Sequence, residues 1–357
     1  MHERIGGRQR LANMNKEAPK LNDVARMAGV SPATVSRALS TPEQVRPETR
    51  IKVDKAARLL GYVPNGAARA LASRRSRTVG AVIPTLDNAI FANSVNALQG
   101  TLAEAGYTLL IGTHSYDPSV ELKVTRALIE RGVDGMVLVG TDHDPKLYQL
   151  LGVFRTPYVL TWSLESSSQH PSIGFNNREA AIRVTRYLLD LGHRNFAVIS
   201  GLTEHNDRAR DRVAGVRDAL HARGLHLAPK AIIEKPYSFV SGQEGIRELM
   251  KRAPLPSAVL CINDVLAVGA IIECQAEGLE VPNDVSITGF DDMEIGAQLA
   301  PGLTTMRLPT VALGRSAAAY LLDRFAGREV ATSTELPVEL VVRGSTAPPR
   351  SRHPRTK

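Results

Sequence analysis

The sequence contains few cysteines and no long hydrophobic run. Cys261 and Cys274 are the only cysteines among 357 residues, and both fall within apolar helix or strand patterns. They support neither a disulfide framework nor a thiolate metal site, and they fit a reducing compartment. No stretch approaches the roughly 20 apolar residues of a membrane helix, and the N-terminus lacks an apolar signal-peptide core. We therefore expect a cytoplasmic chain with no membrane partner.

The signatures of several enzyme classes are also missing. The sequence has no GxGxxG, Walker A, GxSxG or HExxH pattern, which argues against dinucleotide, nucleoside triphosphate, serine hydrolase and zincin chemistry. His193 follows a helix stop and is interpreted as a turn or packing residue. Asp291, Asp292 and Glu294 imitate a metal cluster, but acids after a strand more often cap a helix or bind hydroxyls. We expect no enzyme, no cofactor and no metal.

The charge is unevenly distributed. Residues 1–77 hold 16 Lys and Arg against 6 Asp and Glu, whereas residues 78–357 hold 28 against 30. A basic head on a nearly neutral body indicates a polyanion partner for the head alone. A solvated basic tail is the alternative that charge by itself leaves open.

Helix start and stop signals predict three short helices in the head. The first covers 21–28 and ends at Gly29, and the second starts with Ser31 as N-cap and Pro32 as first residue, running to about Leu39. A third begins at Pro47 and stops at Gly61. The positions expected to form their core are Val24, Ala25, Ala28, Val35, Leu39, Val53, Ala56, Ala57 and Leu60. Two helices joined by a glycine turn form a helix-turn-helix, whose second helix can enter a major groove.

The remainder alternates apolar strands with helical patterns. Strands are predicted in TVGAVIP, YTLLIG, GMVLVG, YVLTW, FAVISG, SAVLCIN and VSITGF. Continuous apolar strands separated by helices predict an α/β body with parallel sheets in a doubly wound fold. One such helix is expected from Arg178 to Leu191, with Asn177 just before it. Because seven units exceed one sheet, we expect two lobes, with crossovers near Ser163, Asp291 and Pro309.

Ligands of open α/β sheets bind at the carboxyl ends of strands. The residues found there combine aromatic rings, carboxylates, amides and arginine, which suit a polyhydroxylated ligand. They are Asp87, Phe91, Trp162, Phe175, the segment from Arg208 to Arg212, Tyr237, Asn263, Asp264 and Asp291. The alternatives are a core position for Phe91 and Phe175, a surface salt bridge for Arg212 and a helix cap for Asp264.

Two head segments, LNDVARMAGVSPATVSRALS and TRIKVDKAARLLGYVPNGAARALA, closely resemble the lactose-repressor/galactose-repressor (LacI/GalR) family, and the similarity continues to about Thr346. The resemblance implies a transcriptional repressor with a periplasmic-binding-protein-like body, binding a double-stranded palindromic operator as a homodimer under a small-molecule effector. It places Pro32 and Ala33 at base edges. Arg37 can form a bidentate pair with guanine. Phosphate contacts or caps are expected for Asn22, Ser31, Thr34 and Ser36.

The segment from Asn65 to Ser73 is too short to be a stable isolated helix. Its alanines, Ala68 among them, would let two copies pack closely. The resemblance implies paired hinge helices in the minor groove, with Leu71 wedged into a base step. Packing of Leu71 on the body is the alternative.

The resemblance also supports individual effector contacts. Arg212 fits the family arginine before a glycine, Asn263 and Asp264 fit its Asn-Asp pair, and Asp291 fits its acid after Gly-Phe. Phe175 and Tyr237 fall at aromatic wall positions. Trp162 stands where other members carry an aspartate, a departure that prevents transfer of a specific sugar. Because Arg212 can bind a carboxylate or phosphate, a sugar acid is attractive, and STPEQV and IIECQAEGLEVPNDVSITGF resemble the gluconate-repressor branch.

The predicted organisation is a disordered basic arm (1–19), the head (20–64), hinge and linker (65–77), the effector and dimerisation body (78–346) and a disordered tail (347–357). The Pro- and Arg-rich tail cannot form a heptad seam, so a dimer is expected over a tetramer. Residues 1–13 are interpreted as a misassigned start or an arm. A sugar-transport receptor and a metabolic enzyme are the competing classes, and the former has no basic three-helix head.

Overall fold

The computed structural model describes residues 18–64, 66, 75–87, 89–165, 167, 169–252 and 254–350. It divides into two compact units, Met1–Ser76 and Arg77–Lys357, called here the head and the body.

The head is built from the three predicted helices and one short turn. They are α2 (Leu21–Ala28), α3 (Pro32–Ser40), the 3-10 turn η1 (Pro42–Gln44) and α4 (Pro47–Leu60). Gly29 and Gly61 both end their helices with φ of 66°, a left-handed conformation that glycine adopts without a steric penalty. Val24, Val35 and Val53 are fully buried at the centre. Leu39 and Leu60 are only partly buried, whereas Ala38, which the sequence did not single out, is buried.

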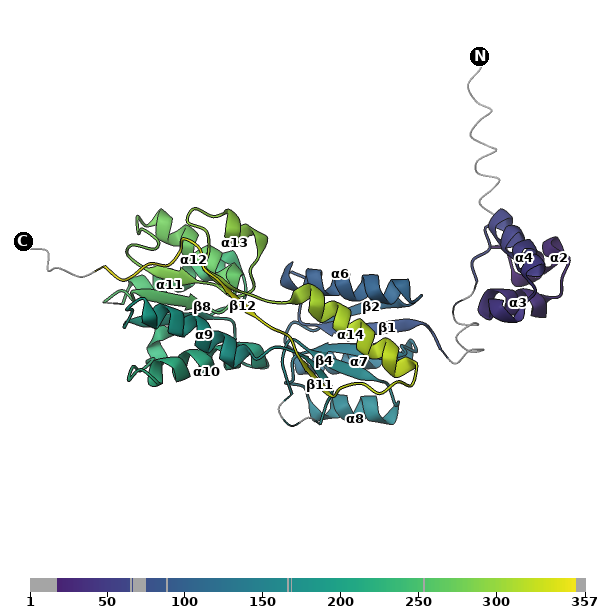
Figure 1. The fold of residues 1–357 in the computed structure, drawn as a ribbon, viewed down its shortest axis with the longest axis horizontal. Helices are drawn as coiled ribbons and strands as arrows, with labels where there is room; N and C mark the ends of the chain where they lie inside the picture. Colours follow the sequence, from purple (N-terminus) through teal and green to yellow (C-terminus); the bar gives the residue numbers. More distant parts are fainter. Residues whose placement is uncertain are drawn as a thin grey trace, which may run out of the picture. The chain divides into compact units, whose positions relative to one another are not determined.

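The body contains two parallel sheets, one in each lobe (Figure 1). The first lobe has the order β11-β5-β4-β3-β1-β2 and the second has β7-β6-β8-β9. First-lobe strands are β1 (Thr78–Ile83), β2 (Thr108–Thr113), β3 (Gly135–Val139), β4 (Tyr158–Thr161), β5 (Ser172–Gly174) and β11 (Ser333–Glu335). Second-lobe strands are β6 (Phe196–Ser200), β7 (Ile232–Glu234), β8 (Ala258–Cys261) and β9 (Ser286–Thr288).

Helices cover both faces of the first sheet. They are α6 (Ala89–Glu104), α7 (Pro118–Glu130), α8 (Pro145–Val153) and α14 (Thr310–Phe325). Side chains alternate along β1, so that Ala81 packs in the cluster with α6 and α14 while Val82 packs with α7 and α8. The α14 helix runs along α6 over the same face, although it comes more than 200 residues later (Figure 1). Burial on both faces explains the continuous apolar runs of these strands.

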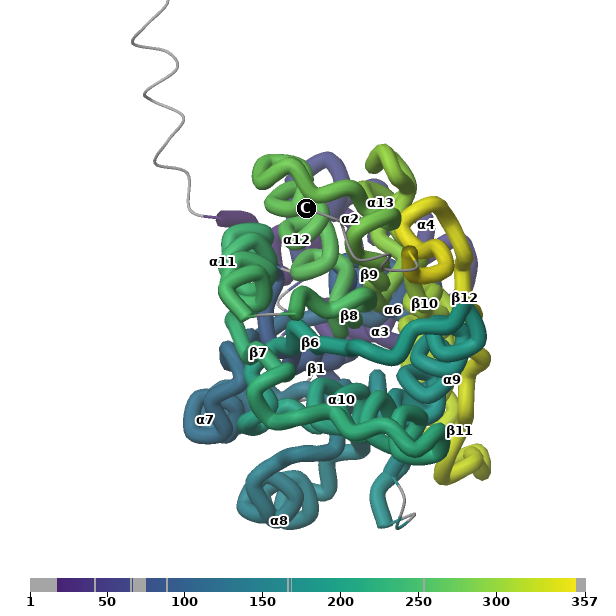
Figure 2. The backbone as a smooth tube through the Cα atoms, turned by 90° about the vertical axis from the view of Figure 1, so that its left-hand side faces the viewer, coloured from purple at the N-terminus to yellow at the C-terminus, as the bar shows by residue number. Residues whose placement is uncertain are grey.

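The second sheet is likewise enclosed on both faces. Its helices are α9 (Asn177–Asp190), α10 (Asp207–His221), α11 (Phe239–Met250) and α12 (Asp264–Ala276), joined by the turn η2 (Pro229–Ala231) and the short helix α13 (Glu294–Gln298). Figure 2 shows α11 and α12 on one side of β6 and β8, with α9 and α10 on the other. A two-stranded antiparallel ribbon, β10 (Thr305–Arg307) with β12 (Glu339–Val341), adjoins β9 through a bridge between Thr288 and Thr304.

Two expected crossovers need correction. The chain does not leave the first sheet near Ser163, because β5 still pairs with β4, and the exit follows Gly174. The chain also does not cross near Asp291. It continues through α13 and β10 in the second lobe before entering α14 near Pro309, and it returns after β11. Among the described residues, six strands have three residues each, and of these only β9, which lies within VSITGF, was predicted; β5, β7, β10, β11 and β12 were missed.

Two boundaries also differ from the prediction. Asn176, not Asn177, caps α9 by accepting a hydrogen bond from the Glu179 backbone. The segment 347–350, assigned to a disordered tail, lies on the body. There the Ala347 carbonyl is 2.9 Å from Nε2 of His193, and Arg350 pairs with Glu280 at 2.8 Å. His193 is thus a buried packing residue, as predicted.

Candidate nucleic-acid interface and ligand cleft

The second head helix begins with a side-chain cap. Oγ of Ser31 accepts a hydrogen bond from the Thr34 backbone at 3.1 Å, and the two hydroxyl oxygens lie 2.8 Å apart. Pro32 occupies the first helical position, where no intrahelical N–H is required. Ser31 therefore has the capping role that was left open, and Thr34 supplies the backbone N–H that is capped at the start of α3.

The remaining predicted DNA contacts lie on the head surface. Pro32, Ala33, Ser36 and Arg37 are exposed on α3, and Asn22 is exposed on the first turn of α2. No described residue forms a hydrogen bond or ion pair with the Arg37 side chain, so its five N–H donors are available to a ligand. The opposite face of α3 carries Val35 and Ala38 into the core.

Basic residues surround this surface. The exposed cations among the described residues of the head are Lys20, Arg26, Arg37, Arg46, Arg50, Lys52, Lys55, Arg58 and Arg75. Arg26 pairs with Asp23 at 3.1 Å and Arg50 with Asp54 at 3.8 Å. Asn65, Ala68 and Leu71, which were predicted to contact DNA, lie outside the described residues. The head presents one exposed helix with a free arginine and a basic surround, which suits a polyanion with readable edges.

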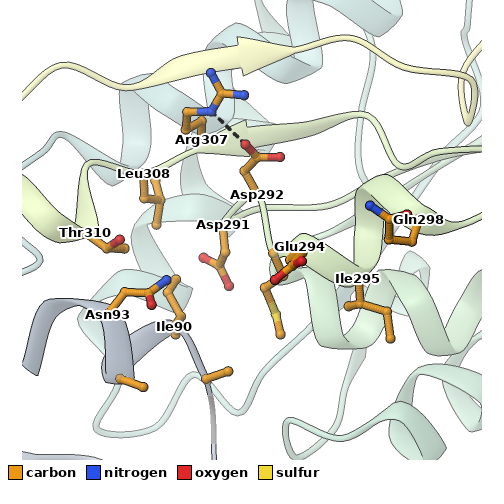
Figure 3. A pocket seen from close by; sticks show the side chains of 13 residues that line it. Ile90, Asn93, Asp291, Asp292, Glu294, Ile295, Gln298, Arg307, Leu308 and Thr310 are labelled. Carbon is orange, nitrogen blue, oxygen red and sulfur yellow. Dashed lines mark hydrogen bonds and ion pairs between the residues drawn. The ribbon is translucent and has the colours of Figure 1, made fainter. Parts of the chain in front are cut away.

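In the body, a cavity of about 730 Å³ lies between elements of both lobes (Figure 3). Ile90 and Asn93 line it from α6, Asp291 and Glu294 line it from the second lobe, and Thr310 lines it from the start of α14. A second cavity of about 360 Å³ is lined by Asp87 and Tyr237, which come from opposite lobes. These two cavities are called here the cleft, and they are the candidate ligand site of the body.

The structure brings Arg212, Asn263 and Asp291 together, and of these three only Asp291 lines a cavity of the cleft. Nδ2 of Asn263 donates to Oδ2 of Asp291 at 2.6 Å, and Nη1 of Arg212 lies 3.7 Å from Oδ1 of the same carboxylate. The guanidinium also donates to Oδ1 of Asn177 at 2.9 Å and to the Ile262 carbonyl at 2.7 Å, with its carbon 3.9 Å from the Phe290 ring centre. Arg212 is therefore a buried, fixed side chain and not a surface salt bridge.

Asp291 has an unmet bonding requirement. It is 6% exposed with φ of 132°, and no described residue donates a hydrogen bond to its Oδ1. Burial raises the pKa of this carboxyl well above its usual range, although Arg212 acts in the opposite direction. A buried acceptor without a donor is costly, so a hydroxyl or amine of a ligand in the cleft would satisfy it.

Asp264 has a structural role that differs from the predicted cap. Asn263 is the N-cap of α12, accepting from the Val265 backbone at 2.7 Å. Asp264 instead accepts from Oγ1 of Thr305 at 2.6 Å and from the Met293 backbone at 2.7 Å. Burial raises its pKa to about 6, against the lowering effect of these hydrogen bonds. It fixes the loop that presents Asp291.

Three aromatic residues that were predicted to contact the effector, Phe91, Trp162 and Phe175, pack against one another. The Phe91 and Trp162 ring centres are 4.9 Å apart, and those of Trp162 and Phe175 are 6.3 Å apart. Their exposed fractions are 4%, 3% and 1%, and none lines either cavity of the cleft. This is the core role left open for Phe91 and Phe175, and Trp162, expected to contact the effector, is enclosed with them. The strand ends are covered by neighbouring elements, which encloses their rings.

A polar contact between the lobes escaped the sequence analysis. Oδ2 of Asp207 accepts from the Thr141 backbone at 2.9 Å and from its hydroxyl at 3.0 Å, while Oδ1 accepts from Arg208 at 2.7 Å. Nη2 of Arg210 donates a further hydrogen bond between the lobes, to Oδ2 of Asp142 at 2.7 Å. Burial acts to raise the pKa of Asp207, but Arg208 and Thr141 outweigh it and lower the value to about 2. The sequence DRARDR signalled charge there, but its partners lie over 60 residues away.

Of the three acids that imitate a metal cluster, Asp292 is paired with two arginines. Asp292 binds Arg307 at 2.7 Å and Arg343 at 2.6 Å, and Figure 3 shows the first of these pairs beside Asp291 and Glu294. Within the described ranges no group of three or more His, Cys, Asp or Glu side chains could hold a metal ion.

Both cysteines are buried and free. No helix of the described chain is long and apolar enough to cross a membrane.

Two family models match the chain. The model for bacterial regulatory proteins of the lacI family matches residues 20–65, and a periplasmic binding protein-like domain matches residues 185–346. The transcriptional repressor CytR of Escherichia coli K12 is 32% identical over 338 residues, covering 94% of this chain and 98% of that protein. The transcriptional regulator GntR of Pseudomonas aeruginosa is 35% identical over 330 residues, covering 92% and 96%.

Solved structures agree with this result. A lac repressor dimer bound to operator and an anti-inducer is 28% identical with a TM-score of 0.81, covering 93% of this chain and 100% of that one. A complex of the regulator CelR with cellobiose is 31% identical with a TM-score of 0.68, covering 92% and 99%. These relatives are regulators and not enzymes, as predicted. The chain belongs to the lacI family of bacterial DNA-binding transcriptional regulators.

Proposed function

We propose that this protein represses transcription in the cytoplasm by binding a palindromic operator as a homodimer. The observation that carries the proposal is α3, an exposed helix with an unpaired Arg37 in a basic head. Arg37 reads guanine, while Pro32 and Ala33 make apolar contact with base edges. Asn22 and Ser36 contact phosphates. The lac repressor structure, described as a dimer on its operator, supports the dimeric arrangement.

The hinge would add minor-groove contacts. In this proposal Leu71 of each subunit wedges into a central base step while Asn65 and Ala68 lie at the paired hinge helices. Such wedges kink the duplex, and they cost unstacking energy that extra contacts repay.

The effector is a small sugar or sugar acid, with gluconate a candidate. Asp291 and Asn263 offer acceptors and donors for hydroxyls, and Arg212 offers a cation for a carboxylate. Asp87 and Tyr237 line the adjoining cavity. The segments STPEQV and IIECQAEGLEVPNDVSITGF, which resemble the gluconate-repressor branch, favour gluconate. Binding would act on operator affinity by altering contacts between the lobes, such as Asp207 with Thr141.

Two measurements on the full chain test the proposal. Selection from a genomic fragment library should enrich an inverted repeat, and R37A should reduce the enrichment and relax the preference at one base pair of each half-site. A thermal-shift panel of sugars, sugar acids and sugar phosphates should then identify a ligand that changes operator affinity. The change should be lost in D291N, with the exposed-site variant D190N as control. Enrichment of no sequence would overturn the proposed function, and a ligand response unchanged in D291N would overturn the proposed cleft.

A further inference from the structure

A cavity of about 390 Å³ lies in the second lobe, away from the ligand cleft. It adjoins Phe196, the first residue of β6, and Pro256, just before β8. Since these strands are parallel, their amino ends meet at one edge of the sheet. Asn263 and Asp291 follow the carboxyl ends of β8 and β9 at the opposite edge. This cavity, called here the basal pocket, is therefore distinct from the effector site.

Cationic side chains from three connecting segments surround the basal pocket. Arg194 follows α9, His226 and Lys230 follow α10, and Arg252 follows α11. The described lining contains no Asp or Glu, although residues 78–357 as a whole carry more acids than Lys and Arg. The pocket thus concentrates positive charge on a body that is otherwise slightly acidic.

Among the described residues, no acid forms an ion pair with Arg194, Lys230 or Arg252. Nη1 of Arg194 donates to the carbonyls of Leu189 and His193 at 3.2 and 2.9 Å, which leaves the Nε and Nη2 donors available. No described acid pairs with Lys230 or Arg252. Other cations of the same lobe are neutralised: Lys235 pairs with Glu248 at 2.6 Å and Arg223 with Asp190 at 2.7 Å.

The floor of the basal pocket is apolar. Phe196, Leu220 and Leu249 are buried beneath it, and Pro254 and Pro256 form part of the rim. Pockets for small organic ligands range from about 300 to 1,000 Å³ and combine apolar walls with a few polar groups. An apolar floor beneath unpaired cations fits an organic anion better than a free inorganic ion.

We propose that the basal pocket binds a small phosphorylated metabolite, with its phosphate held by Arg194, Lys230 and Arg252. Arginine binds phosphate with two parallel hydrogen bonds, and lysine binds it as a point charge. The ligand's uncharged part lies on the apolar floor. This gives the regulator a second ligand site, separate from the effector cleft and from the DNA-binding head.

Titration calorimetry of the full chain with AMP and glucose 6-phosphate tests this site. We expect at least one to bind saturably, and R194Q/K230Q/R252Q to weaken binding tenfold or more. The control K123Q/R126Q/R217Q removes three exposed charges elsewhere in the body and should change affinity less than twofold. Adenosine and glucose, which lack the phosphate, should not bind at this site.

Three results would overturn the proposal. The first is no saturable binding of either phosphate ester. The second is equal weakening in both triple variants, because the anion would then respond only to overall charge. The third is binding of inorganic phosphate as tight as that of the esters, since the apolar floor would then contribute nothing. Circular dichroism of both variants verifies that they are folded.

Discussion

Arg37 on α3 and Arg212 on α10 are both arginines on short amphipathic helices, yet their surroundings differ completely. Arg37 is exposed, and no described residue bonds to its side chain. Arg212 is 6% exposed and is held by Asn177, Ile262 and Asp291. The first can contribute free energy only when a partner arrives. The second contributes to folding and also pre-organises the cleft, so damage to it has two consequences.

The largest effect should follow from removing the buried arginine. R212L removes the counterion of Asp291 and leaves Asn177 and the Ile262 carbonyl without their donor, so it should lower the free energy of unfolding of the body by about 3–5 kcal/mol. Denaturant unfolding followed by fluorescence of Trp162, the only tryptophan, measures this. The exposed control R217L should stay within about 0.5 kcal/mol of wild type. A loss below about 1 kcal/mol in R212L would show that the two arginines do not differ as described.

A pH effect should follow from Asp264. Its pKa is raised from 3.8 to about 6 in the folded body. The folded state favours the protonated form of Asp264. Its contribution to the free energy of unfolding, about 2–3 kcal/mol, is therefore fully present below pH 4 and is lost as pH rises through 6. Denaturant unfolding between pH 4 and 7 should show a flatter profile for D264N than for wild type. Parallel profiles would contradict the raised pKa.

The exposed arginine should affect binding without affecting folding. R37A should weaken operator binding by about 1–3 kcal/mol and relax preference at one base pair, while unfolding stays within about 0.5 kcal/mol of wild type. Fluorescence anisotropy on matched and single-substituted duplexes measures both affinities. K55A, which removes an exposed α4 charge, should weaken binding to all duplexes equally. If R37A, like K55A, weakened binding to all duplexes equally, Arg37 would be a phosphate contact and not a base contact.

The smallest expected effect concerns the start of α3. S31A removes the hydroxyl that caps the helix and should destabilise the head by about 1 kcal/mol. Hydrogen exchange at the α3 amides of the full chain measures local opening. S36A, an exposed serine on the same helix, should leave exchange within about 0.5 kcal/mol of wild type. Equal protection of the α3 amides from exchange in S31A and wild type would show that the Ser31 cap does not stabilise the head.

The head was the more predictable region because its signals are local. Gly29, Ser31, Pro47 and Gly61 each mark a helix end through their own backbone chemistry. In the body, the longer apolar strands were predicted for the same reason. The strand β5 (Ser172–Gly174) carries no such pattern, and missing it displaced the first crossover.

The cleft was predicted in part. Arg212, Asn263 and Asp291 were expected because polar residues follow the strand ends, and the structure brings them together. The positions of Phe91, Trp162 and Phe175 depend on how other elements cover the strand ends, which no local pattern specifies. The bond between Thr141 and Asp207 joins residues distant in sequence, so only the folded chain identifies it.

The most direct measurement is the preference of the purified full chain for one duplex over a scrambled duplex of equal length, at moderate ionic strength. Specific binding by an exposed reading helix predicts an affinity ratio of about 10³ or more, which R37A should lower by about 1–3 kcal/mol. A ratio near one, with and without candidate sugars and sugar acids, would show that the head binds only the phosphate charge and would contradict the proposed repressor.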